Sequence, residues 1–392
     1  MSAERRSRSW LIAALSGRGL AKAATRAGLP TRGIDGYADL DTQAYSRAWA
    51  RAPQTADYSL DPSTLLDQAA TLCPPTRCHG LVYGAGFESR PELLAQLAEG
   101  RRLFGNSPEV LAQTGNPTRF FPLLKRLGIP HPEVRYTRPR RALGWLSKQA
   151  GACGGTHIQP VLPNTDGAGR YFQRQVQGQS CSLLFLANGH TIFPVGFNRP
   201  LPPPPEAPGP WAYSGAARLG GETSRDFAAL LDAARALTSA LGLKGLNGID
   251  VMIDQRDWKL LELNPRPTAT MELWDVAPMP SLFDLHVQAC QGVLPTSLPN
   301  LQGCLASAVV YAGETLQIPS DFVWPDWCSD LPAAGSVISP GEPVCTVLAA
   351  GDSVTVAEYW AGEFRRSILR RLSSFQARDF SLSNTTEEPA WA

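Results

Sequence analysis

Two carboxylates and an amide occur in this sequence at a spacing that suits a divalent metal ion. Glu262 follows Asp250 by twelve residues, and Asn264 and Arg266 come after Glu262 in two-residue steps. Carboxylate and amide oxygens are the ligands that Mg²⁺ and Mn²⁺ prefer, whereas a zinc site would use His or Cys. Asp250, Glu262 and Asn264 are therefore candidate ligands of a metal that bridges phosphate oxygens, with the Arg266 guanidinium close by.

A β-hairpin is the element that would bring these side chains together. The apolar segments 248–253 and 258–263 predict two strands, and the polar residues 254–257 predict the turn between them. Neighbouring strands can place Asp250 and Glu262 on one face. The alternative is a pair of solvent-exposed hairpin carboxylates, which the apolar sequence around Glu262 disfavours.

A lysine followed by a glycine-rich loop is the second feature. The segment 145–148 predicts a strand that delivers Lys148, and the loop 151–157 supplies backbone N–H groups of the kind that hold phosphate oxygens. Because the lysine precedes the glycines, this is not a Walker A motif. A plain glycine-rich hairpin explains the pattern equally well. We expect Cys153 in this loop to be a small loop residue rather than a reactive thiol.

The third feature lies between the other two in the chain. Residues 171–178 predict a strand that runs into a turn, and the backbone amides of Arg174, Gln175 and Val176 could meet the edge of an adenine ring. An ordinary strand is an equally good interpretation of this segment.

The surrounding pattern predicts an α/β and α+β chain with several domains. Strand and helix signals alternate over about the first hundred residues, as in a βαβ start, and from about residue 300 short apolar segments broken by Pro and Gly predict a β-rich unit. We expect an N-terminal domain over 8–110, a central domain over 111–295, a β-rich domain over 296–372 and a flexible tail over 373–392. A helix is predicted over 224–241.

The composition argues against several kinds of function. The 392 residues carry 36 Lys or Arg against 35 Asp or Glu, a formal net charge of +1, which argues against a general nucleic-acid or anionic-membrane partner. No apolar stretch approaches the roughly 18 to 20 residues that span a bilayer. Eight cysteines are too few for a disulfide scaffold and indicate reduced thiols in the cytoplasm. Cys73 and Cys78-His79 resemble half a zinc site, but no second Cys/His pair answers them.

The order of these features resembles the ATP-grasp superfamily. Its members carry an acidic metal ligand about a dozen positions before a Glu-x-Asn-x-Arg strand, here Asp250 and Glu262-Leu-Asn264-Pro-Arg266. The resemblance covers roughly residues 8–350. It implies a Rossmann-like N-terminal domain, an ATP-grasp domain with its lid at about 134–178, a small β-rich C-terminal domain and a homodimer.

The resemblance also implies a role for each matching residue. It implies contacts to ATP from Lys148, from Gly154, Gly155 and Thr156 in a closing loop, and from Arg174, Gln175 and Val176 along adenine. It implies Mg²⁺ binding by Asp250, Glu262 and Asn264, with Arg266 steadying the transferring phosphoryl group or an acyl phosphate.

Two positions depart from the superfamily pattern. Many members have a further ATP-contacting lysine eleven residues before the Gly of a Gly-Ile-Pro segment; counted back from Gly128, that position is Pro117, with Arg119 nearby. Arg174 stands where members often have Glu. We expect ATP binding to survive both changes, with altered affinity and adenine selectivity.

A finer resemblance concerns the substrate. The segments Tyr83-Gly-Ala-Gly-Phe-Glu88 and Gly105-Asn106-Ser-Pro-Glu109 resemble predicted carboligases, related to biotin carboxylase, that occur with pterin and furan one-carbon cofactor synthesis of the methanopterin and methanofuran type. This resemblance implies that an amino acid such as glutamate is joined to an amine or carboxylate of a cofactor precursor.

Together these features predict an ATP- and Mg²⁺-dependent ligase that joins a small-molecule carboxylate to an amine through an acyl phosphate and releases ADP. One rival is an NAD-dependent oxidoreductase, suggested by Ser16-Gly-Arg-Gly19 after one strand and Asp35 after the next. A second is a non-catalytic nucleotide-binding subunit, suggested by Pro117. A biotin-dependent carboxylase is the third, disfavoured because no bicarbonate-binding set can be located.

Overall fold

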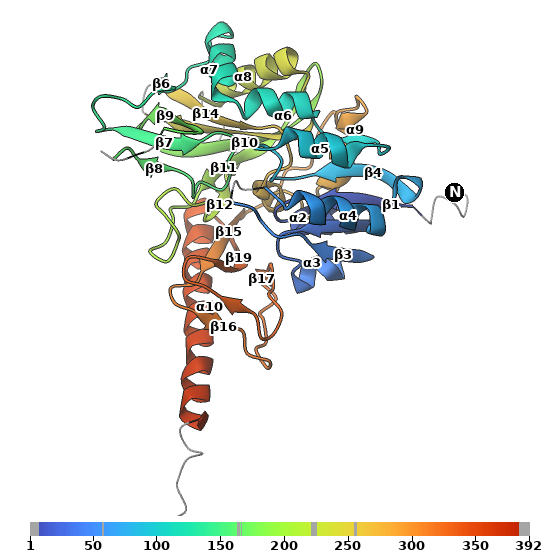
Figure 1. Cartoon of the computed structure of the whole chain (residues 1–392), viewed down its shortest axis with the longest axis vertical. Helices are drawn as coiled ribbons and strands as arrows, with labels where there is room; N and C mark the ends of the chain where they lie inside the picture. The colour runs from blue at the N-terminus through green and yellow to red at the C-terminus, as the bar shows by residue number, and fades with distance from the viewer. Residues whose placement is uncertain are drawn as a thin grey trace, which may run out of the picture.

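The computed structural model describes residues 8–56, 59–162, 165, 167–220, 226–254 and 257–383. These residues form a parallel sheet, a long antiparallel sheet and a smaller lid sheet, with helices packed around them (Figure 1). This architecture confirms the predicted α/β and α+β class. Among the described residues, no helix is both long enough and apolar enough to cross a bilayer.

The N-terminal part is a five-stranded parallel sheet in the order β3-β2-β1-β4-β5. Its strands are β1 (Ser9–Ala13), β2 (Thr31–Asp35), β3 (Ala48–Arg51), β4 (Cys78–Tyr83) and β5 (Leu103–Phe104). The helices between them are α2 (Arg18–Arg26), α3 (Leu40–Ala44), α4 (Pro62–Leu72), the 3-10 turn η1 (Pro75–Arg77) and α5 (Pro91–Ala98). These elements confirm the βαβ start. Because the carboxyl ends of parallel strands meet at one edge of a sheet, the loops after β1, β2 and β4 lie together.

The antiparallel sheet has eight strands in the order β14-β13-β10-β11-β12-β15-β19-β17. Its strands are β10 (Gln179–Asn188), β11 (Ile192–Pro200), β12 (Gly215–Arg218), β13 (Lys244–Ile253), β14 (Trp258–Asn264), β15 (Cys304–Tyr311), β17 (Cys328–Ser329) and β19 (Pro343–Gly351). The helical elements of this central region are α6 (Pro108–Thr114), α7 (Pro117–Arg126), α8 (Asp226–Leu241), η2 (Ala269–Leu273) and α9 (Leu282–Cys290). Residues 224–225 of the helix predicted over 224–241, and 255–256 of the predicted hairpin turn, lie outside the described residues.

Strand β10 is buried on both faces and joins two cores. Leu183 and Phe185 belong to a core shared with α7 and α8, whereas Leu184 and Leu186 belong to a core shared with α9 and the N-terminal sheet. The ring of Trp10 in β1 meets that of Phe283 in α9, 5.5 Å apart between centroids. The N-terminal sheet is thereby held against one face of the antiparallel sheet.

The segment 134–178, expected to be the lid and called the lid below, contains a separate four-stranded sheet in the order β6-β9-β7-β8. Its strands are β6 (Val134–Arg135), β7 (Trp145–Gln149), β8 (Gln159–Pro160) and β9 (Arg170–Arg174). Trp145, Val161 and Phe172 form a small core of its own. Lys148 in β7 pairs with Tyr171 in β9.

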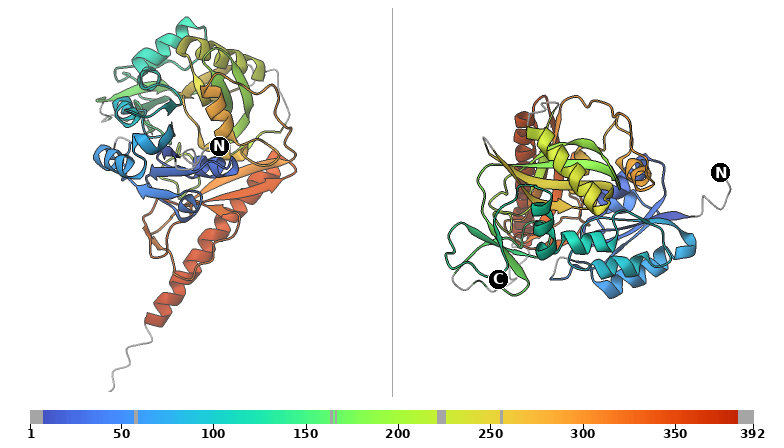
Figure 2. Two further views of the ribbon diagram at one scale, coloured as in Figure 1. Left: turned by 90° about the vertical axis from the view of Figure 1, so that its right-hand side faces the viewer. Right: turned by 90° about the horizontal axis from the view of Figure 1, so that it is seen from above.

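The C-terminal part continues the antiparallel sheet, because β15 pairs with β12 on one side and with β19 on the other. The short strands β16 (Leu316–Gln317) and β18 (Val337–Ile338) pair beside it. Helix α10 (Val354–Ser383) packs on β15 and β19 and then projects away from the body of the molecule (Figures 1 and 2).

Helix α10 was not among the predicted elements, although its sequence carries the signal. Ala357, Ala361, Ile368 and Leu372 are buried at spacings of four or seven residues, which is a helical period. Residues 373–383 of the expected tail lie in this helix, and 384–392 lie outside the described residues.

Candidate functional site

The two strands with the acidic residues pair as the predicted hairpin. Asp250 in β13 lies directly opposite Glu262 in β14, and the amide nitrogen of Asn264 donates to Asp250 Oδ2 at 2.9 Å. The pairing shifts between Asp250 and Val251, which places a bulge at Leu261. Leu261 and Glu262 consequently both line one cavity.

Burial and charge shape this pair of carboxylates. Burial raises the pKa of Asp250 to about 6, and burial together with the charge of Asp250 raises the pKa of Glu262 to about 7. The carboxylates are thus not the exposed hairpin pair of the alternative interpretation. A divalent cation between them would offset their mutual repulsion.

The oxygen donors here fit Mg²⁺ with phosphate as a co-ligand. Within the described part of the chain, no cluster of three or more His, Cys, Asp or Glu side chains has a metal-binding arrangement. Two carboxylates and the Asn264 amide oxygen would therefore need oxygens from a ligand, which is how Mg²⁺ is commonly held. Asn264 Oδ1 accepts a hydrogen bond from Arg266 Nη2 at 2.9 Å and keeps a second lone pair.

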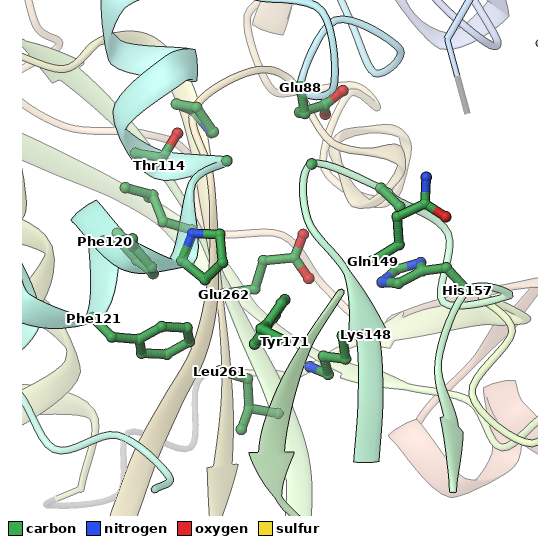
Figure 3. Close-up of a pocket in the computed structure, with 16 residues that line it drawn as sticks. Glu88, Thr114, Phe120, Phe121, Lys148, Gln149, His157, Tyr171, Leu261 and Glu262 are labelled. Carbon is green, nitrogen blue, oxygen red and sulfur yellow. The ribbon is translucent and has the colours of Figure 1, made fainter. Parts of the chain in front are cut away.

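Lys148 reaches the same site from the lid. Its side chain is buried, which lowers the pKa of its ammonium group, while the charges of Glu262 and Asp250 act in the opposite direction. Lys148, Tyr171 and Glu262 line the cavity between the lid and the antiparallel sheet (Figure 3). The cavity holds about 50 Å³ of free space, which is far below the roughly 300 Å³ at which ligand pockets begin.

The glycine-rich loop is packed closely against two other segments. A Cβ on Gly151 would lie 2.7 Å from the carbonyl oxygen of Glu88, and one on Gly155 would lie 1.8 Å from that of Trp211. The carbonyl of Gly154 accepts a hydrogen bond from the amide of Tyr213 at 2.9 Å. This loop, which also contains Thr156, is docked on the N-terminal domain and on the segment after the proline run. Burial raises the pKa of the neighbouring Cys153 to about 12, in keeping with a loop residue rather than a reactive thiol.

The proposed adenine edge is only partly available. The amide of Arg174 donates to the carbonyl of Glu133 at 2.8 Å, and the amide of Gln175 donates to that of Gly144 at 2.9 Å. Of the three predicted amides, these two are therefore engaged within the lid sheet. Val176 lines a second, smaller cavity at the base of the lid.

Position 117 brings no charge to the site. Pro117 itself lines the cavity, at the first turn of α7, and Arg119 is exposed on that helix. The hydroxyl of Tyr136 donates to the carbonyl of Pro117 at 3.0 Å. Lys148 and Arg266 are consequently the cations that the described residues bring to the two carboxylates.

Residues of the N-terminal domain complete the site, and sequence reasoning assigned them no role. Glu88 lines the cavity and forms an ion pair with Arg266. The side chain of Asn106 donates to Asn247 Oδ1 and to the carbonyl of Pro265, both at 2.8 Å. Both residues belong to segments noted only for their family resemblance, and their partners are about 140 to 180 positions away in sequence.

The residues that suggested a dinucleotide site and a zinc site are engaged in contacts within the protein itself. Asp35 accepts hydrogen bonds from the amides of Gly17 and Ala38, and the Trp49 indole covers Gly17 and Gly33 so closely that neither could carry a Cβ. The Trp49 indole thus packs directly against the glycine turn that suggested a dinucleotide site. All eight cysteines are free thiols; Cys73 and Cys78 are buried, whereas His79 is exposed with its ring against that of Trp10.

Comparison with known proteins gives evidence on the fold that is independent of the site geometry. Residues 116–270 match the model of the ATP-grasp domain. Formate-dependent phosphoribosylglycinamide formyltransferase of Burkholderia vietnamiensis is 38% identical over 82 residues, which are 21% of this chain and 20% of the relative. The chain thus matches about a fifth of the length of this curated relative.

Two solved structures share the fold over most of the chain. One is the biotin carboxylase domain dimer of Hydrogenobacter thermophilus 2-oxoglutarate carboxylase with MgADP and bicarbonate, with a TM-score of 0.65 and 12% identity over 88% of this chain and 87% of that one. The other is carboxyaminoimidazole ribonucleotide synthase from Aspergillus clavatus with ATP, with a TM-score of 0.65 and 14% identity over 93% of this chain and 99% of that one. Residues 116–270 therefore match an ATP-grasp domain, and the chain has the ATP-grasp fold.

Proposed function

We propose that this protein is an ATP- and Mg²⁺-dependent ligase that joins a carboxylate to an amine through an acyl phosphate. One observation carries the proposal: Lys148 of the lid and Glu262 of β14 line one cavity, and strand pairing and hydrogen bonds connect Glu262 to Asp250, Asn264 and Arg266. The curated relative and the two structural neighbours, by name a formyltransferase, a carboxylase and a synthase, support an ATP-dependent ligation at this site.

In the proposed reaction, a carboxylate oxygen of the substrate attacks the γ-phosphorus of ATP, and the bond from that phosphorus to the β–γ bridging oxygen breaks. Lys148 and Arg266 hold positive charge where negative charge develops on the phosphoryl oxygens. Asp250, Glu262 and Asn264 would hold Mg²⁺, which would supply positive charge to offset that of the phosphates. The amine then attacks the acyl carbon, loses a proton, and expels inorganic phosphate.

Exclusion of water is the task of the lid in this scheme. An acyl phosphate is hydrolysed if water reaches it, so the loop 151–157 has to be closed during transfer. Its close contacts to Glu88 and Trp211 support this role, because they hold the loop against two other segments of the chain. Adenine would lie toward Val176 at the base of the lid.

The finer assignment concerns the substrates. The Tyr83–Glu88 and Gly105–Glu109 segments support a carboligase of one-carbon cofactor synthesis, of the methanopterin or methanofuran type, with glutamate as one candidate substrate. A homodimer, as named for one structural neighbour, is part of the same proposal.

A second candidate is a non-catalytic nucleotide-binding subunit. The observation that favours it is Pro117, an uncharged residue lining the cavity where a lysine is expected. This candidate predicts ATP binding without turnover.

The experiment is Mg²⁺-dependent ADP release measured across a panel of carboxylates and amines, with Glu262→Gln beside the wild type. The exposed Glu92 on α5 supplies the matched control Glu92→Gln. We expect turnover only with one carboxylate and one amine together, at least about 100-fold lower in Glu262→Gln and unchanged in Glu92→Gln. Turnover unaffected by Glu262→Gln would refute the metal site, and ATP binding without turnover with any pair would favour the second candidate.

A further inference from the structure

A buried ion pair connects the N-terminal domain to the end of β14. Glu88 follows β4, and its Oε1 accepts a hydrogen bond from Arg266 Nε. Its Oε2 accepts from the amides of Gly86 and Phe87, at 2.8 and 3.0 Å. The two side chains are 12% and 9% exposed, so solvent competes little with the pair.

The contacts of Glu88 and Arg266 continue to a proposed metal ligand. Arg266 Nη2 donates to Asn264 Oδ1, and Asn264 Nδ2 donates to Asp250 Oδ2, each at 2.9 Å. Glu88 is therefore the first member of a hydrogen-bonded series that runs through Arg266 and Asn264 to Asp250. A substitution of Glu88 therefore acts first on the orientation of the Arg266 guanidinium and last on the Asp250 carboxylate.

The guanidinium keeps donors for a ligand. An arginine has five N–H groups, and the described residues accept from three of them: Nε to Glu88, Nη2 to Asn264, and Nη1 to the carbonyl of Pro267 at 3.4 Å. Two N–H groups are left over for oxygen atoms that enter the site. Because the other three are held by protein, the direction of these two is set before a substrate binds.

We infer that Glu88 is a positioning residue, which acts through Arg266 to aim its remaining donors at the transferring phosphoryl group. This inference rests on the proposed function and assigns to the N-terminal domain a part in the chemistry of the ATP-grasp domain. The charge of Arg266 keeps the pKa of Glu88 low in spite of its burial, so the pair is held as a charged one. Its two oxygens are already engaged by protein donors, which leaves the contact with substrate to Arg266.

The test compares binding of Mg·ADP alone with binding of Mg·ADP plus aluminium fluoride, which mimics a phosphoryl group in transfer. Wild type, Glu88→Gln, Arg266→Gln and the double variant are measured by calorimetry, with Glu92→Gln as the control. Glutamine keeps the size of Glu88 and removes its charge, so the variant weakens the hold on Arg266 without opening a cavity. Thermal unfolding of each variant shows whether the fold is kept.

We expect aluminium fluoride to tighten Mg·ADP binding by the wild type and by Glu92→Gln. In Glu88→Gln this tightening falls by about tenfold or more, the range for loss of one partner of a buried charge pair, while the affinity for Mg·ADP alone changes less than about threefold. In the Arg266→Gln background, Glu88→Gln has no further effect.

Three results would overturn the inference. Unchanged tightening in Glu88→Gln would show that the pair does not aim Arg266, and equal losses with and without aluminium fluoride would show a purely structural role. Independent, additive effects of the two substitutions would show that Glu88 does not act through Arg266. A wild type that fails to bind Mg·ADP would instead refute the proposed function itself, and this inference with it.

Discussion

Docking of the glycine-rich loop depends on a glycine that a side chain cannot replace. Gly155 has a φ of +79°, and a Cβ there would lie 1.8 Å from the carbonyl oxygen of Trp211 and 2.8 Å from its carbonyl carbon. Both are backbone atoms of a segment that is itself bonded to the loop, through the amide of Tyr213 and the carbonyl of Gly154. Gly154 has nearly the same φ, +73°, but a Cβ there meets no atom within 4 Å. Comparing alanine at position 154 with alanine at position 155 therefore distinguishes the effect of backbone strain from the effect of losing the docking contact.

The expected magnitudes follow from this geometry. Alanine at either position has the left-handed backbone conformation, which costs about 1–2 kcal/mol. Alanine at 155 also has to bring its Cβ to at least 3.0 Å from the Trp211 oxygen, so the loop retreats by more than about 1 Å. A misplacement of that size costs on the order of 100-fold in a reaction that requires closure.

The assay combines Mg·ATP affinity by calorimetry with amide hydrogen exchange over 151–157. We expect Gly155→Ala to weaken Mg·ATP binding by about tenfold or more and to speed exchange in the nucleotide-bound state. Gly154→Ala should lower the unfolding free energy by the same backbone strain as Gly155→Ala. Its loop should nevertheless stay protected from hydrogen exchange in the nucleotide-bound state. Equal effects of the two variants on nucleotide binding and on exchange would refute the docking argument.

Two further outcomes concern stability. His286 is buried, and its Nδ1 accepts from the amide of Leu246 at 2.9 Å, which requires the neutral ring; burial lowers its pKa to about 4. Because the unfolded ring takes up its proton near pH 6.5, the unfolding free energy should fall by at most about 3 kcal/mol as the pH drops from about 6.5 to about 4, and His286 should cause no pH dependence above that window. Urea unfolding of His286→Gln should lack this pH dependence. An identical pH dependence in both proteins would contradict the argument. Arg18 is buried and joins Glu272 and Asp330, at 2.5 and 2.6 Å. Arg18→Met leaves both carboxylates without their main partner, so the unfolding free energy should fall by about 3–5 kcal/mol. A loss below about 1 kcal/mol in urea titrations would count against a structural role for the ion pairs of Arg18.

Local sequence was enough to predict the acidic hairpin. Alternation of apolar residues sets two strands, and the two-residue period places Glu262 and Asn264 on one face, while the bulge at Leu261 brings Asp250 opposite Glu262. The strand that carries Lys148 and the helices α2, α5 and α8 follow from the same short-range periodicity. These predictions succeed because each depends on residues fewer than about 15 positions apart.

Long-range packing decided the rest of the candidate site. Glu88 and Arg266 are 178 residues apart, and no periodicity relates them; they meet because the N-terminal sheet packs on the face of β10 that carries Leu184 and Leu186. The steric need for glycine at 155 likewise exists only once the 211–213 segment lies against the loop.

The same distinction explains the misleading glycine turn near the N-terminus. The sequence by itself determined a strand, a turn and an acidic residue that suit a dinucleotide, as well as the hairpin that suits a metal and phosphate. Only the tertiary structure decided between them, because the indole of Trp49 covers the first site while the lid and the N-terminal domain enclose the second. Periodicity acts through neighbouring residues, whereas the shape and charge of a cavity depend on side chains that folding brings together from distant parts of the chain.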